Sequence, residues 1–123
     1  MVFDPDFDPG DGRRRLLQKR CKQHGLEMRR HWYMGASLGT ARWAASWAEL
    51  LMHQPDRPDG VIVLDDNLTG PVLEGLANAG VRVGRDVDVV AHCNFPLTQE
   101  LPKAVCRIGF DNRQFLAMAL ELI

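Results

Sequence analysis

Two short polar clusters in the middle of this chain have side chains that could bind a ligand or carry out chemistry. The first is Asp65 and Asp66, and the second is residues 92–94, His-Cys-Asn. Carboxylate and carboxamide oxygens accept hydrogen bonds from ligand hydroxyls, and carboxylates also bind magnesium. Adjacent histidine and cysteine side chains are a possible nucleophile and base. Each cluster directly follows a run of β-branched, apolar residues, at 61–64 and 87–91.

The elements that must position these clusters lie within residues 58–96. Both apolar runs are typical of buried strands, and the apolar positions between 68 and 77 recur at helical spacing. Pro71 fits an early helical turn, and Gly80 is suited to end the helix. Two parallel strands joined by a helix form a right-handed unit whose strand ends lie at one edge of the sheet. Open α/β sheets bind ligands at that edge, so we expect the clusters to lie close together there.

Catalysis by these residues is an alternative that the rest of the sequence does not favour. A receiver-like or phosphatase-like site built on Asp65 would need a second acidic pair near the N-terminal strand, and that strand offers none. Lys103 is the only lysine available for such a site. His92 and Cys93, being adjacent in a strand, should point to opposite faces. We therefore predict a binding domain that is not an enzyme and uses neither a cofactor nor a metal.

Composition describes a globular domain without a general attraction to nucleic acid or membranes. The 123 residues are 46% hydrophobic and 25% charged, with a net charge of -1. The three cysteines form no CxxC pair, which disfavours a zinc ribbon or a disulfide framework. Residues 13–31 carry eight basic side chains against Glu27, which we interpret as a solvated helix face, with a phosphate-contacting patch as the alternative. With no signal sequence and no long apolar run, we predict a cytoplasmic protein that does not contact membranes.

The remaining segments alternate between strand and helix patterns, which predicts an α/β, Rossmann-like three-layer sandwich with a mainly parallel sheet. Trp43 and Trp47 are interpreted as core residues of a helix for which Thr40 is the predicted side-chain cap, with a ligand platform as the alternative. In chain order, the expected segments are the end of a strand at 1–3, a helix at 13–24 closed by Gly25, a strand within 26–34, a helix from 40 to 51, a strand at 104–108 and an amphipathic helix at 111–123.

Three stretches carry a resemblance to a known family. PDGVIVLDDNLTGPVLEGLANAG, the following VRVGRDVDVVAHCN and the late DNRQFLAMALELI resemble the effector-binding core of LacI/GalR-type transcriptional regulators. The resemblance covers about residues 13 to 123. It implies one lobe of a periplasmic-binding-protein-like fold, in which two Rossmann-like lobes close on a small ligand. A sugar-binding protein of a transporter, which has the same fold, is the alternative.

The resemblance also implies how the chain is divided and what it binds. The chain would be a fragment of an effector-binding domain, with about residues 1–97 in the C-terminal subdomain. The strand and helix at about 104–123 would belong to the other lobe. The partners implied are a sugar-like or other small metabolite as effector and a second copy in a homodimer. DNA would be contacted only through an N-terminal domain outside this chain.

The resemblance implies five candidate ligand-binding residues. Arg13 matches an arginine that bonds sugar hydroxyls or acidic groups, and its guanidinium has a rigid fork of donors. Asp65 matches a polar residue at the tip of the strand, and Asp66 a common aspartate that is better suited to cap the following helix. Cys93 stands where an aspartate usually accepts bonds from the sugar. Asn94, which can both donate and accept, would take over that contact.

Overall fold

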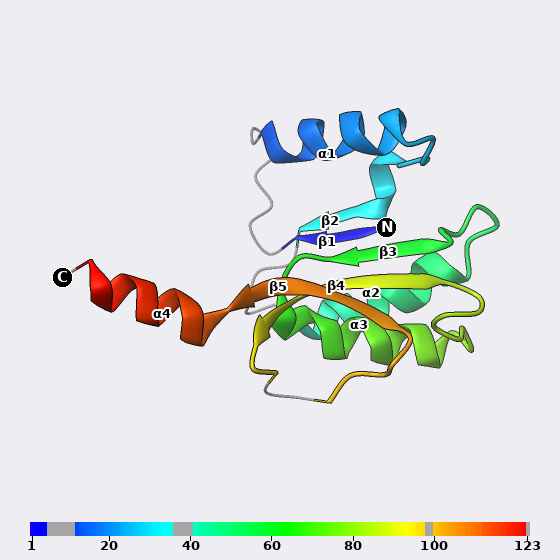
Figure 1. Cartoon of the computed structure of the whole chain (residues 1–123). Helices are drawn as coiled ribbons and strands as arrows, with labels where there is room; N and C mark the ends of the chain where they lie inside the picture. The colour runs from blue at the N-terminus through cyan, green and yellow to red at the C-terminus, as the bar shows by residue number, and fades with distance from the viewer. Residues whose placement is uncertain (5–11, 36–40, 98–99, 123) are drawn as a thin grey trace.

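The fold is a five-stranded, all-parallel sheet with helices on both faces (Figure 1). We describe residues 1–4, 12–35, 41–97 and 100–122 of a computed structural model. The strand order is β2-β1-β3-β4-β5. The strands are β1 (Val2–Asp4), β2 (Tyr33–Gly35), β3 (Gly60–Val63), β4 (Asp88–Phe95) and β5 (Val105–Asp111). The helices are α1 (Gly12–Gln23), the 3-10 turn η1 (Arg30–Trp32), α2 (Ala41–Met52), α3 (Asp66–Asn78) and α4 (Asn112–Glu121).

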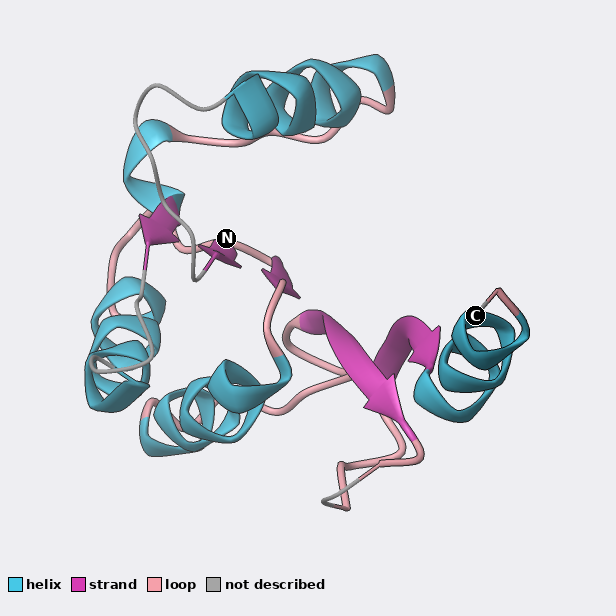
Figure 2. Ribbon diagram, turned by 90° about the vertical axis from the view of Figure 1, so that its left-hand side faces the viewer, coloured by secondary structure: helices cyan, strands magenta, loops and turns pink. Residues whose placement is uncertain are grey.

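The connections reverse direction between β1 and β3. The chain passes from β1 through α1 to β2 on one side, and from β3 through α3 to β4 on the other. Figure 2 shows α1 on one face of the sheet and α2 with α3 on the other. The predicted α/β fold with a parallel sheet is therefore confirmed. Such a reversal marks the place where open parallel sheets bind ligands, outside the carboxyl ends of the strands.

The core lies between the sheet and the pair α2 and α3. Alternate residues of β3 and β4 face these helices and are buried, as the two-residue period of a strand requires. The two helices approach each other closely at Gly75, where an added Cβ atom would lie 2.1 Å from the backbone oxygen of Ala45. The helical side chains that fill this core are Ala44, Ala48, Leu51, Leu68, Val72 and Leu76.

Three predictions about individual elements need correction. A strand was predicted within 26–34, but the strand formed is Tyr33–Gly35 and η1 precedes it, because β1 offers just three residues for pairing. The second strand of the central unit continues past its predicted end to Phe95, because β5 pairs with this polar part. Trp43 is 69% and Trp47 38% exposed, so the assignment of these two residues to the core is wrong. The predicted cap Thr40 lies outside the described residues.

The C-terminal arm, β5 followed by α4, differs from the rest of the fold. β5 is the edge strand of the same sheet and pairs with β4 over seven residue pairs. Helix α4 then extends away from the body (Figure 1), and none of its described residues is buried. The assignment of residues 104–123 to another lobe stays a prediction. Among the described helices, none is both long enough and apolar enough to cross a membrane.

Candidate functional site

The carboxyl edge of the sheet brings Asp65, Asp66 and Asn94 together. Asp65 is the N-cap of α3, with φ −139°, and its Oδ1 atom accepts from the backbone N of Asn67 at 2.8 Å. The capping role predicted for Asp66 is therefore wrong. Asp66 is the first residue of α3, and its Oδ2 atom accepts from Asn94 Nδ2 at 2.7 Å. This bond joins the end of β4 to the start of the helix that follows β3.

The bond between Asn94 and Asp66 fixes the orientation of the Asn94 carboxamide. A carboxamide has two N–H donors and an oxygen that accepts, so the bond to Asp66 uses only part of its capacity. A carboxylate such as that of Asp66 has two oxygens, each of which can accept hydrogen bonds. Two half-buried polar groups in a fixed arrangement can therefore bind a ligand that both donates and accepts hydrogen bonds.

Cys93 lies on the opposite face of β4 from Asn94. The side chain of Cys93 is 1% exposed, within the core beneath α3, and its Sγ atom lies 3.7 Å from the backbone oxygen of Ala91. Burial raises the pKa of the Cys93 thiol, the nearby carboxylate of Asp66 raises it further, and Arg107 opposes both. Ligand contact by Cys93 stays a prediction. In this geometry the thiol is protonated at neutral pH and supports the strand that carries Asn94.

An aromatic side chain that was not predicted lies beside Asn94. Phe110 of β5 pairs in register with Asn94 of β4, and Ile108 pairs with His92. Paired residues of neighbouring parallel strands face the same side of the sheet. Phe110 is 68% exposed, and its ring meets that of His92 edge-on at 5.8 Å between centroids. Only the strand register shows this neighbourhood, because 16 residues separate the two positions in the sequence.

A second unpredicted group lies at the same edge, where β1 and β2 end. Asp4 is 3% exposed and accepts a hydrogen bond from the hydroxyl of Tyr33. The guanidinium of Arg14 lies over the Tyr33 ring, 5.5 Å from its centroid. Asp4 follows an apolar strand just as Asp65 does, and that signal could have identified it from the sequence. The group places a carboxylate on each side of the position where the connections reverse.

Arg13 is in the first turn of α1, and this helix begins at the carboxyl edge because it follows β1. Its side chain is exposed. The structure therefore places Arg13 at the same end of the fold as Asp65 and Asn94 (Figure 1). Within the described residues, no three histidine, cysteine, aspartate or glutamate side chains are grouped closely enough to hold a metal ion. The edge therefore offers hydrogen-bonding groups and an aromatic ring.

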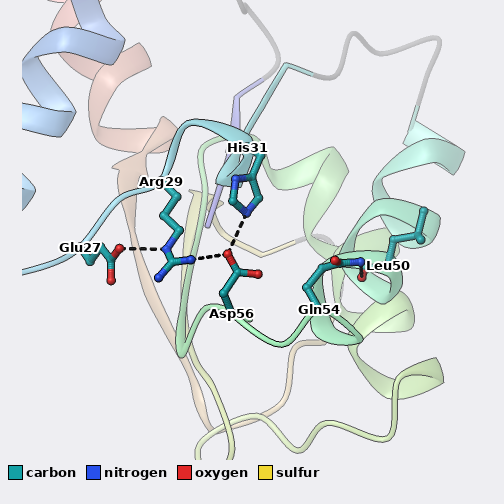
Figure 3. A network of polar contacts seen from close by, with 6 residues as sticks. All are labelled: Glu27, Arg29, His31, Leu50, Gln54 and Asp56. Carbon is teal, nitrogen blue, oxygen red and sulfur yellow. Dashed lines mark hydrogen bonds and ion pairs between the residues drawn. The ribbon is translucent and has the colours of Figure 1, made fainter.

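The amino edge of the sheet has a different character. A groove of about 810 Å³ lies there, with Trp32, Ile62 and Val90 among its lining residues. Ion pairs on its rim connect the segment before β2 to the loop before β3 (Figure 3). Arg29 Nε lies 2.8 Å from Glu27 Oε1, and Arg29 also binds Asp56.

The carboxylate of Asp56 is the centre of this network, because His31 Nε2 also lies 3.4 Å from its Oδ2 atom. Partial desolvation is the largest single effect and raises the pKa of Asp56, but the hydrogen bond from Arg29, a backbone hydrogen bond and the charges of Arg29 and His31 together hold the pKa below its usual value. Such half-exposed pairs contribute little to folding stability individually, and together they fix one loop against another. None of the predicted site residues lies in this network.

The geometry of the carboxyl edge can now be compared with known proteins. The chain matches the model of the periplasmic binding protein-like domain over residues 1–121. The chain belongs to this family. No curated protein gives a significant sequence match.

One solved structure shows how this periplasmic binding protein-like chain relates to larger proteins. It is a LacI family transcriptional regulator from Arthrobacter sp. FB24, crystallised in complex with lactose. The two structures superpose with a TM-score of 0.77 at 23% sequence identity, over 98% of this chain. The fold predicted from the sequence resemblance, one lobe of a periplasmic-binding-protein-like core, is thereby confirmed. The chain spans 44% of the length of that regulator.

Proposed function

We propose that this chain is one lobe of the effector-binding core of a LacI-type transcriptional regulator, and that it binds a sugar-like metabolite at the carboxyl edge of its sheet. The observation that carries the proposal is the 2.7 Å bond between Asn94 and Asp66, which fixes a donor and acceptor pair across β4 and α3. Phe110 lies beside this pair in the register of β5. Hydroxyl-rich ligands with an apolar ring face suit an aromatic platform next to such polar groups.

The proposed roles follow from the position of each residue. Asn94 and Asp66 exchange hydrogen bonds with ligand hydroxyls, and Arg13 contributes a planar set of donors from α1. Asp65 keeps its capping bonds and offers its second oxygen to the ligand. Cys93 acts from beneath the strand, because its thiol is buried. Binding of this kind involves no chemical step, so the chain acts by recognition.

The wider proposal concerns what the binding event controls. A second lobe, outside this chain, would close over the ligand, and α4 with its exposed apolar side chains would pack against that lobe. The assembled core would form a homodimer in the cytoplasm, and ligand binding would shift its equilibrium between two arrangements. DNA would be bound by a domain that is also outside this chain. The match, which covers 98% of this chain and 44% of that regulator, supports this division.

The test is a thermal-shift and calorimetric screen of the chain against lactose, other sugars and nucleosides. We expect weak binding by a single lobe, and a rise in the melting temperature that saturates with ligand concentration. Asn94→Ala and Phe110→Ala should each weaken binding by about tenfold, the equivalent of one lost hydrogen bond or ring contact. Glu74→Ala, at an exposed position of α3, is the matched control.

Two outcomes contradict the proposal. One is that the wild type and Asn94→Ala respond equally to every sugar and nucleoside in the screen. The other is stabilisation only by magnesium with acetyl phosphate, which would point to a phosphoacceptor built on Asp65 and Asp66.

A further inference from the structure

Helix α1 carries a concentration of positive charge, most of which the proposed effector site does not use. Its 12 residues include no aspartate or glutamate and six basic side chains, which are Arg13, Arg14, Arg15, Lys19, Arg20 and Lys22. Residues 13–31 hold eight basic side chains and one acidic, whereas the rest of the chain holds seven basic and fifteen acidic. The net charge of -1 therefore conceals a basic helix on an acidic domain.

Several of these side chains lie in a row on the solvent side of α1. Arg15, Lys19 and Lys22 are exposed and are spaced i, i+4 and i+7, so they follow one side of the helix. We call these three residues the basic row. Arg20 is also exposed and adds a fourth charge. Among the described residues, none of these four has an acidic ion-pair partner.

The side of α1 that contacts the sheet determines the direction of the basic row. Cys21 is buried, and Arg14 lies over the ring of Tyr33. From the helical repeat, the residues of the basic row are turned by about 90° to 150° from these two positions. Figure 2 shows α2 and α3 on the other face, so the sheet separates Glu49 and Glu74 from the row. The row therefore faces solvent without acidic neighbours from those helices.

The stability of α1 does not account for this composition. Arginines in the first turn oppose the helix dipole, whose positive end lies there. A solvated helix face usually mixes both signs, because opposite charges four residues apart stabilise a helix and like charges repel. Arg15 and Lys19 are a like-charged pair at that spacing. Stability alone would favour acidic residues at some of these positions, so the composition suits a negatively charged partner.

We propose that the basic row, together with Arg20, binds the phosphate backbone of duplex DNA without regard to base sequence. This contact goes beyond the proposed function, in which a domain outside this chain binds DNA. A duplex has one negative charge per about 1.7 Å of its axis, so a helix about 18 Å long with a charge in each turn can neutralise several phosphates. Six of the eight basic residues within 13–31 are arginines, whose planar donors fit phosphate oxygens.

The other negatively charged surfaces that a basic helix can bind are membranes and acidic proteins. A helix that lies on a membrane needs a broad apolar side toward the lipid, but on α1 only Leu16 is both large, apolar and mostly exposed. A protein interface usually has aromatic or apolar anchors at its centre, and the basic row has none. The row offers charge alone, which is the character of a sequence-independent contact with DNA.

Fluorescence anisotropy of the whole chain with a labelled duplex tests the proposal. We expect the affinity to fall about 100-fold between about 50 and 200 mM salt, as four phosphate contacts predict. A second duplex of unrelated sequence should bind with the same dissociation constant, because the contacts are made to the backbone.

A variant without the basic row gives the decisive comparison. We expect it to raise the dissociation constant at low salt by about tenfold or more and to reduce the slope of affinity against salt by about 3 on logarithmic axes. This row variant carries Arg15→Gln, Lys19→Gln and Lys22→Gln.

A matched control removes the same charge from exposed positions outside α1, and should leave both the dissociation constant and the slope unchanged. This control variant carries Arg57→Gln, Lys103→Gln and Arg113→Gln. Circular dichroism melts confirm that both variants fold.

The proposal is overturned if the wild type does not bind the duplex at low salt, or if the row and control variants weaken binding equally. Tighter binding to polyglutamate or to phosphatidylglycerol vesicles than to the duplex would also overturn it, and would assign the row to an acidic protein or a membrane. No sugar is present and the row variant leaves the carboxyl edge unchanged. Failure here therefore leaves the effector screen unaffected, and failure of that screen leaves the DNA result unaffected.

Discussion

Helices α3 and α4 begin in the same way and end in opposite environments. The carboxylate of Asp65 accepts from a backbone N–H two residues along in α3, and that of Asp111 accepts from the backbone N–H groups of Arg113 and Gln114 in α4. Yet α3 buries five of its residues, whereas no described residue of α4 is buried. The contrast teaches that caps and apolar spacing determine where a helix forms. Burial depends on whether another part of the protein covers it.

Truncating one leucine in each helix should give the largest difference between α3 and α4. Leu76→Ala leaves a cavity beneath the sheet and should lower the free energy of unfolding by about 2 to 5 kcal/mol. Leu116→Ala removes a side chain that is 60% exposed and should change it by less than about 0.5 kcal/mol. Urea denaturation followed by circular dichroism measures both. Equal losses would show that α4 is covered in solution.

Removing the caps should have a smaller effect. Asp65→Ala should lower the global free energy of unfolding by about 1 kcal/mol, because α3 unfolds together with the core. Asp111→Ala should loosen α4 without moving the urea midpoint, since the body does not depend on that helix. Amide hydrogen exchange of Arg113 and Gln114 would report the local change. A shifted midpoint for Asp111→Ala would contradict the independence of the arm.

The smallest expected effects concern two cysteines, one in the body and one in the arm. Cys93 of the body is buried and Cys106 of the arm is exposed, so a thiol reagent at neutral pH should label Cys106 rapidly and Cys93 only after unfolding. Burial raises the pKa of Cys93 in the folded state, so its contribution to stability is complete below the unfolded thiol pKa of about 8.5 and is lost as the pH rises above it. Melting temperatures of the wild type should therefore fall more steeply above this pH than those of Cys93→Ala. A matching decline in Cys93→Ala would contradict this.

Much of the body could be predicted because its local signals and its tertiary contacts agree. The β-branched run before Asp65, the helix after it and the closing glycine all appear in the structure, where Gly80 has a φ of 72°. The position of the polar clusters at one edge of the sheet was predictable for the same reason, since the carboxyl ends of parallel strands lie at the same edge. The bond between Asp66 and Asn94 is a direct consequence of that geometry.

Features that depend on pairing partners or on packing order could not be predicted. The polar end of β4 remains a strand because β5, which was predicted only as far as residue 108, pairs with it up to Asp111. Phe110 reaches the candidate site only through that register. Trp43 was misplaced because helical spacing identifies an apolar side of α2 but does not tell which of two adjacent stripes faces α3. The cap of α3 is Asp65, one residue before the predicted Asp66. The sequence pattern does not show at which of two adjacent residues the backbone becomes helical.

The long ladder between β4 and β5 connects the arm directly to the candidate site. Seven residue pairs hold β5 to β4, the ladder ends at the pair of Phe95 with Asp111, and α4 begins at the next residue. Phe110 therefore lies one residue before Asp111, the cap of α4. The aromatic ring beside Asn94 and the first turn of the outward helix thus belong to one uninterrupted segment of the chain.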